Sequence, residues 1–257
     1  MQAIRTEEWT VQAHEKRIYG RIWYPAAAGK HPAVILSHGY NGNHAGFERE
    51  CRFFAQNGVT AYSFDFCGGS VASKSSGVST DMTLFTEKED LLAVVDAAVQ
   101  WDFVDAGAIF LLGGSQGGLA TIVAAAAHQG ELAGMMLMYP ALSAKEDHRV
   151  NSYQSPDDVP ADVSLFGGWM HVGKNYITDI WNVDFYELLS AYKGKVLLLH
   201  GDRDATVPLS YSEKALDLLD ACEFHVIKNR GHEFFGQPFE DAVSYILAYL
   251  QAQLNNG

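Results

Sequence analysis

The chain has 257 residues, of which 18 are Lys or Arg and 31 are Asp or Glu, so its formal net charge is −13. Such a negative protein repels phosphate backbones and anionic lipid headgroups unless its cations are clustered, and the sequence contains no run of Lys and Arg. With 48% hydrophobic and 19% charged residues, the composition is that of a globular protein. These values argue against nucleic-acid or membrane partners and favour a small-molecule substrate.

Three features of the sequence indicate in which cellular compartment the protein is expected. The first ten residues are polar and lack the apolar stretch of a signal peptide. The most apolar stretches, 119–127 and 132–139, are much shorter than the roughly 18 residues of a membrane span. Three cysteines form an odd number without close pairs, which is typical of a reducing compartment. We therefore expect a soluble, cytoplasmic protein; a homo-oligomer is compatible with the sequence.

Strand signals dominate the chain from its beginning. Residues 5–24 carry aromatic and branched side chains around a turn at 14–16, which predicts an antiparallel hairpin at a sheet edge. Six short apolar runs follow, typical of strands that are buried on both faces of a parallel sheet: Ala33–Leu36, Val59–Phe64, Ile109–Leu112, Met135–Tyr139, Val196–Leu199 and Phe224–Ile227.

Helical spacing separates these runs. A capping-box pattern at Thr86 and Glu89 predicts the start of one helix, and Ser210 with Glu213 predicts another. Pro238 at a first-turn position predicts the start of the last helix. The alternation of strands and helices predicts an α/β fold in which all 257 residues form one domain, with a mostly parallel central sheet flanked by helices.

One segment interrupts the alternation. Residues 141–190 follow the sixth strand, counting the two strands of the hairpin. They show no clear strand and are too many for a simple connection in a compact domain. We expect this segment, called the insertion below, to act as a lid over a functional site. It is rich in aromatic side chains: Tyr153, Phe166, Trp169, Tyr176, Trp181, Phe185 and Tyr186.

A candidate nucleophile stands in the middle of the chain. Gly113-Gly114-Ser115-Gln116-Gly117 matches Gly-x-Ser-x-Gly, directly after a predicted strand and directly before a helix-like stretch. In this context a sharp turn projects the serine hydroxyl from the sheet, and the helix N-terminus favours negative charge that develops there. The alternative is a Gly-rich turn with an incidental serine.

A serine hydroxyl needs a base, which is in turn oriented by an acid. His232 follows the last predicted strand in a Gly-His turn, and we prefer it to His200 at the mouth of an earlier strand. Asp204 is preferred to Asp202, because it lies further from its strand and can reach a neighbouring loop, whereas Asp202 can shape the turn. The order Ser, Asp, His along the chain is that of α/β-hydrolases.

Acyl transfer also requires N–H donors for the tetrahedral oxyanion. The residue after the nucleophile, Gln116, supplies one backbone N–H, and the loop Ser37-His38-Gly39-Tyr40 places the second at Tyr40. We expect His38 to support this loop.

Two weaker patterns suggest other chemistry. Cys67 could be a thiol nucleophile, but it follows a strand other than the one before Ser115. Gly231-His232-Glu233 begins like a zinc-binding helix, yet the second histidine is missing. We therefore expect neither a metal nor another cofactor.

With these motifs in order, the chain resembles the α/β-hydrolase superfamily over essentially its whole length. A narrower set of motifs resembles bacterial cinnamoyl (feruloyl) esterases: Asp65-Phe66 with the following Gly-Gly-Ser loop, Met82–Asp90, Ser115–Gly118, Lys174–Asp179, and Val207-Pro208 followed by Ser210–Glu213. The resemblance implies a serine carboxylesterase that hydrolyses hydroxycinnamate esters through an acyl-enzyme intermediate, with the insertion covering the site.

By position, the resemblance places Asp147, Gln154 and Tyr176 near the ring hydroxyl of the hydroxycinnamate. The chain departs from the family at Gly114, where relatives have His, and at Cys67-Gly68-Gly69, where many have Gly-His-Gly. Other enzymes would use the same triad: a short-chain acyl esterase, a thioesterase, an acylpeptide-type peptidase or an acyltransferase. A non-catalytic binding protein is the alternative of a different class, and the consistent triad argues against it.

Overall fold

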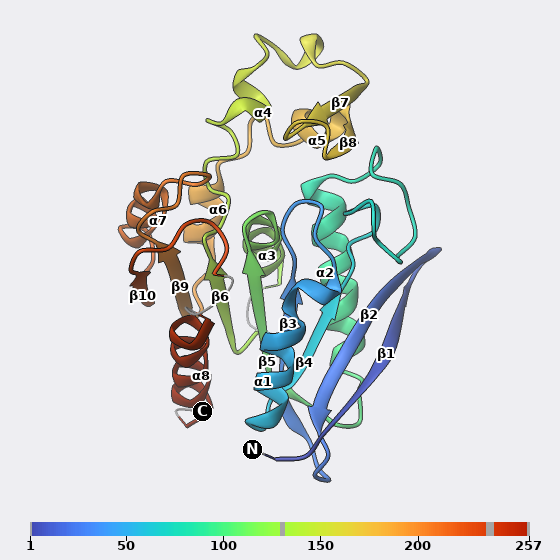
Figure 1. Ribbon diagram of the computed structural model, residues 1–257, viewed down its shortest axis with the longest axis vertical. Coiled ribbons are helices and arrows are strands. Elements are labelled where there is room, and N and C mark those ends of the chain that lie inside the picture. Colours follow the sequence, from blue (N-terminus) through green and yellow to red (C-terminus); the bar gives the residue numbers. More distant parts are fainter. Residues whose placement is uncertain (1, 129–131, 235–238, 256–257) are drawn as a thin grey trace.

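The computed structural model describes residues 2–128, 132–234 and 239–255. Its centre is an eight-stranded sheet in the order β1-β2-β4-β3-β5-β6-β9-β10 (Figure 1). β1 and β2 form the expected antiparallel edge hairpin, and β3, β4, β5, β6, β9 and β10 run parallel, which confirms the predicted sheet. The strands are Ile4–Ala13, Lys16–Pro25, His31–Ser37 and Thr60–Phe64 for β1 to β4, then Val104–Gly114 for β5, Gly134–Met138 for β6, Val196–Gly201 for β9 and Cys222–Ile227 for β10.

Helices cover both faces of the sheet, as the fold class predicts (Figure 1). One face carries α1 (Glu48–Gln56) and α8 (Phe239–Asn255); the other carries α2 (Leu84–Ala98), α3 (Gln116–Ala127) and α6 (Phe185–Ala191). Successive side chains of a strand point to opposite faces, so the apolar residues of the central strands are buried alternately in one of two cores. That explains the continuous apolar runs. Within the described residues, no helix has both the length and the apolar composition needed to cross a membrane.

In the parallel part of the sheet, all the strands end on the same side, which is called the carboxyl edge below. The loops after β3, β5, β9 and β10 therefore converge there, although they are far apart in sequence. These loops carry the residues singled out above as nucleophile, base, acid and oxyanion donors.

The part of the insertion before α6 lies over this edge (Figure 1). It contacts the loop after β3, because the Tyr40 hydroxyl donates to the Met170 carbonyl oxygen at 2.8 Å. The expectation of no strand is wrong, since β7 and β8 form a two-stranded antiparallel sheet. Each has only four residues, and alternate residues of β7 are exposed, so no continuous apolar run marks it in the sequence. The elements of the insertion before α6 are α4 (His148–Asn151), a 3₁₀ turn (Pro156–Asp158), β7 (Asp162–Leu165), β8 (Met170–Gly173) and α5 (Lys174–Thr178).

Two helix starts differ from the predicted ones. The N-cap of α2 is Thr83, which forms a reciprocal capping box with Thr86, so the helix begins before the predicted box. In α7 (Leu209–Leu216), no side chain caps the N-terminus, and Ser210 lies inside the helix. The predicted start at Pro238 lies outside the described residues.

The turn after β5 generates a prediction about stability. A Cβ on Gly117 would lie 2.2 Å from the carbonyl oxygen of Ser37 and 2.4 Å from that of His38, and these backbone atoms cannot rotate away. We expect Gly117→Ala to lower the free energy of unfolding by about 1–3 kcal/mol, because β3 and α3 must separate. Gly46→Ala is the control, since nothing lies within 4 Å of its Cβ position. Equal losses of the two variants in urea unfolding would contradict this account.

Candidate active site

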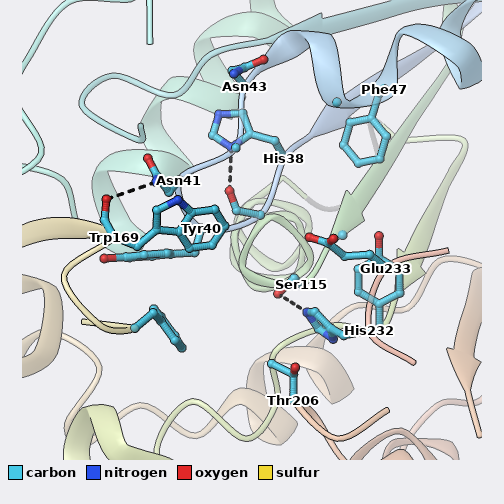
Figure 2. A pocket seen from close by; sticks show the side chains of 16 residues that line it. His38, Tyr40, Asn41, Asn43, Phe47, Ser115, Trp169, Thr206, His232 and Glu233 are labelled. Atoms are coloured by element: carbon cyan, nitrogen blue, oxygen red, sulfur yellow. Dashed lines mark hydrogen bonds between the residues drawn. The ribbon is translucent and has the colours of Figure 1, made fainter. Parts of the chain in front are cut away.

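Side chains from three loops form a chain of hydrogen bonds at the carboxyl edge. The hydroxyl of Ser115 lies 2.8 Å from Nε2 of His232 (Figure 2), and Nδ1 of His232 lies 2.7 Å from Oδ2 of Asp204. With Nδ1–H donating to the carboxylate, Nε2 is the acceptor for the serine hydroxyl hydrogen. The structure thus brings the predicted nucleophile, base and acid together in the arrangement that activates a serine.

The backbone at Ser115 is strained. Its φ is 54° and its ψ is −120°, a region that L residues rarely adopt. The turn is also crowded, since a Cβ on Gly113 would lie 2.3 Å from the carbonyl oxygen of Gly117. The turn places Ser115 at the N-terminus of α3, where the aligned peptide dipoles favour negative charge.

Asp204 is buried and surrounded by donors. Its Oδ1 accepts the N–H groups of Thr206 and Val207, both at 2.9 Å, and its Oδ2 lies 3.3 Å from Nε2 of His200. Burial raises the pKa of the Asp204 carboxyl, but the hydrogen bonds from His200, His232 and the Val207 N–H outweigh it and lower the pKa overall. Asp204 therefore stays ionised and can stabilise a positive charge on the imidazole of His232.

Asp202 and His200 occupy supporting positions. Oδ1 of Asp202 accepts the backbone N–H of Asn229 at 2.6 Å, which ties the loop after β9 to the loop that carries His232. Nδ1 of the fully buried His200 lies 2.7 Å from the hydroxyl of Ser212. Both residues shape the loops that hold the triad.

The two expected oxyanion donors flank the nucleophile. Gln116 is the first residue of α3, so its N–H has no acceptor within that helix. Tyr40 follows Gly39, whose Cβ position would lie only 3.2 Å from Cβ of Ser115. The loop after β3 therefore approaches the serine closely.

His38 supports this loop, as expected. Its Nε2 accepts the backbone N–H of Phe66 at 3.1 Å, and its Nδ1 lies 2.8 Å from the carbonyl oxygen of Gly39. Burial lowers the pKa of His38, which favours the neutral imidazole that can donate at one nitrogen and accept at the other.

Two cavities meet at Ser115. The larger has a volume of about 620 Å³ (Figure 2), and the smaller about 250 Å³. Both are lined by Tyr40, Ser115, Phe166 and Thr206. The larger is also lined by His232, the smaller by Gln116. A nucleophile between two cavities can accommodate the two halves of an ester on opposite sides.

The three residues assigned to the phenolic ring lie in different environments. Asp147 lines the smaller cavity. Tyr176 is buried, and its hydroxyl donates to Oε1 of the Gln116 side chain. Gln154 is exposed, and neither it nor Tyr176 is among the described residues that line the two cavities. Asp147 is thus the one of the three that the structure brings to a cavity beside Ser115.

Sequence reasoning missed Glu87. This acid lies on α2, and its Oε1 accepts Nε2–H of Gln116 at 2.8 Å. Its spacing in the sequence could have indicated that it is buried. Glu87 stands three residues after Leu84 and four before Leu91, on the buried face of the helix.

Glu233 and Tyr139 were also missed. Glu233 directly follows the base, has a φ of 69° and lines the larger cavity (Figure 2). The ring of Tyr139 packs 4.7 Å from that of His232. No pattern in the sequence marks either residue, because each contact depends on how the loop after β10 returns to the sheet.

Known proteins share this fold. The structure of Est1E from Butyrivibrio proteoclasticus with ferulic acid bound superposes with a TM-score of 0.84 at 24% identity, over 95% of this chain and 99% of that one. The α/β hydrolase GrgF from a Penicillium species superposes with a TM-score of 0.80 at 17% identity, over 98% of this chain and 99% of that one. These similarities show the α/β-hydrolase fold.

Sequence comparisons extend the similarity beyond the fold. Human monoglyceride lipase is 30% identical over 138 residues, which cover 53% of this chain and 44%, less than half, of the lipase. The family model for acetyl xylan esterase (AXE1) matches residues 8–247, nearly the whole chain. The chain therefore belongs to the acetyl xylan esterase family and has the α/β-hydrolase fold.

Proposed function

We propose that the chain is a serine carboxylesterase that hydrolyses hydroxycinnamate esters, of the feruloyl or caffeoyl type, through an acyl-enzyme intermediate. The observation that carries this proposal is the unbroken chain of hydrogen bonds from Asp204 through His232 to Ser115, at the junction of two cavities.

In the proposed mechanism, His232 takes the hydroxyl proton as Oγ of Ser115 attacks the ester carbonyl carbon, and ionised Asp204 stabilises the imidazolium. The N–H groups of Tyr40 and Gln116 bond the oxyanion. The bond from the carbonyl carbon to the alcohol oxygen then breaks, and His232 returns the proton to the leaving alcohol. Water, activated by the same imidazole, hydrolyses the acyl-enzyme and frees the serine.

The two cavities can be assigned from this proton transfer. Because His232 protonates the leaving oxygen, the alcohol must lie on its side, in the larger cavity. The acyl group then occupies the smaller cavity, where Asp147 can accept a hydrogen bond from a phenolic hydroxyl. Phe166 also lines this cavity and can pack against a planar acyl group. That Est1E binds ferulic acid supports this acyl group; the description of the family favours acetyl esters as the second candidate.

The triad assignment predicts non-additive losses. Ser115→Ala is expected to abolish nearly all hydrolysis of methyl ferulate, and adding His232→Ala should cost nothing further, because the residues act as a unit. Asp204→Asn should lower kcat by up to about 10⁴ through the wrong imidazole tautomer. Asp202→Asn is the matched control and should retain most of kcat. Greater damage from Asp202→Asn, or additive losses in the double variant, would refute the assignment.

The acyl-site assignment predicts a selective loss. A site that bonds a hydroxyl discriminates against substrates that lack it. Asp147→Ala is therefore expected to raise KM for methyl caffeate by about 10- to 100-fold, the usual value of a hydrogen bond to a charged group. Methyl cinnamate, which lacks the hydroxyl, should show little change. Equal losses on the two esters, or a wild-type preference for acetate esters, would leave only the general esterase function.

The alcohol-site assignment predicts sensitivity to charge. Glu233 lines the larger cavity, and the described residues around it include no Lys or Arg. A caffeate ester of an anionic alcohol such as quinic acid should therefore have a higher KM than methyl caffeate. Because Glu233 is exposed, we expect Glu233→Gln to reduce that KM ratio by about two- to fivefold at low ionic strength. Glu213→Gln, an exposed acid on α7, is the control; an identical reduction there would contradict a local effect.

A further inference from the structure

The side chain of Gln116 is held from two sides. Its Nε2 donates to Oε1 of Glu87 on α2 at 2.8 Å, while its Oε1 accepts the hydroxyl hydrogen of Tyr176 on α5. Gln116 itself begins α3, directly after Ser115. The three side chains form a line from α2, through the residue beside the nucleophile, into the insertion.

This line of side chains is closed to water. Only 1% of Glu87, 3% of Gln116 and 4% of Tyr176 is exposed. Among the described residues, Oε2 of Glu87 has no hydrogen-bond partner. An ionised carboxylate buried with a single amide donor is costly, whereas the neutral acid leaves only one polar group unsatisfied. The contacts therefore favour a protonated Glu87.

The charges around Glu87 point the same way. Asp90, one turn further along α2, is the acid that faces it, and the nearby Lys16 and the N–H of Cys67 bond to Asp90 at 3.4 and 2.7 Å. Burial raises the pKa of Glu87 to about 8, against the hydrogen bond from Gln116 and with a contribution from Asp90. Glu87 is therefore protonated at neutral pH and ionises near pH 8.

We propose that Glu87, as a neutral carboxylic acid, is a positioning residue that fixes Gln116 and thereby its backbone N–H at the oxyanion. This step rests on the oxyanion role proposed above for Gln116. Tyr176 completes the arrangement from the insertion, so the insertion also contributes to the placement of the oxyanion donor.

The proposal has a consequence for the rate. Ionised Glu87 would place a negative charge one side chain away from the N–H that must stabilise a negative oxygen. The ester is neutral in the ground state and the oxyanion forms only during the reaction, so the repulsion lowers kcat rather than raising KM. The effect must grow as pH rises through the pKa of Glu87, because the charge appears there.

The test is the pH profile of kcat and KM from pH 6 to 10 with p-nitrophenyl acetate. We expect kcat of the wild type to fall by on the order of tenfold above about pH 8, the size of effect expected from repulsion between two charges inside a protein. Glu87→Gln, which is uncharged at every pH, should keep its kcat there. KM should change by less than about twofold in both proteins.

Two controls separate positioning from general damage. Glu89→Gln removes an exposed charge from the same helix and should leave the wild-type profile unchanged. Tyr176→Phe removes the hydroxyl but keeps the ring; it should lower kcat several-fold at every pH and retain the alkaline fall. The acetate ester does not need the hydroxycinnamate site, so failure of that assignment would leave this test intact.

A second readout does not depend on activity. Infrared spectra in D₂O should show a protonated carboxylic acid in the wild type at neutral pH, which disappears above about pH 8 and is absent from Glu87→Gln. If that variant does not fold, the wild-type and Tyr176→Phe spectra decide the protonation state. An alkaline fall in kcat that persists in Glu87→Gln, or a wild type without the acid band, would overturn the proposal.

Discussion

The strained turn at Ser115 is the constraint on which the rest of the site depends. A residue at φ 54° costs of order 1–3 kcal/mol, and the turn persists only because its surroundings leave no alternative. Gly117 lies against the carbonyl oxygens of Ser37 and His38 at the end of β3, so β3 is fixed relative to α3. The first three turns of α3 are buried almost completely, and this burial offsets the strain. The hydroxyl is thereby held in place before any substrate arrives.

Two buried acids beside this turn have opposite protonation states for the same physical reason. Asp204 is reached by two backbone N–H groups and by two imidazole rings, so its charge is compensated and its pKa is lowered despite burial. Glu87 is reached by one amide, and its pKa is raised. The number of donors, rather than burial alone, decides which carboxyl carries a charge. An ionised acid is suited to an imidazolium, and a neutral acid is suited to the neighbourhood of an oxyanion donor.

The sequence predicted the parts of this site that depend on local signals. Each triad residue follows a short apolar strand, and the strands of one parallel sheet end on the same side. Their positions after these strands were therefore enough to predict that Ser115, Asp204 and His232 lie together. What it could not predict are contacts between side chains of separate elements. The hydroxyl of Tyr176 binds Gln116, on α3, and Glu87 meets the same amide from α2.

The same distinction explains the errors in the elements. The strands β7 and β8 are short, and alternate residues of β7 are exposed, so they lack the apolar run that marks the central strands. The capping box at Thr83 was missed because its second member is Thr86 rather than Glu or Gln, a pairing that only the geometry of the turn reveals. The hydrophobic pattern of the sequence was sufficient for elements that bury a continuous run of apolar residues. It was not sufficient where a single hydrogen bond decides how an element begins.

The structure indicates what lies around Gly114, where the cinnamoyl esterases have a histidine. A Cβ there would lie 3.3 Å from the hydroxyl of Tyr139 and 3.5 Å from the ring of Phe47, both of which line the larger cavity. A histidine in place of this glycine would therefore fill space beside the base, not beside Asp147. In the assignment proposed above, the leaving alcohol lies on the side of His232, so the glycine would enlarge the room for the alcohol and leave the acyl cavity as it is. Of the two departures from the cinnamoyl esterases that this chain resembles, the one at Gly114 would thus bear on the alcohol half of the ester.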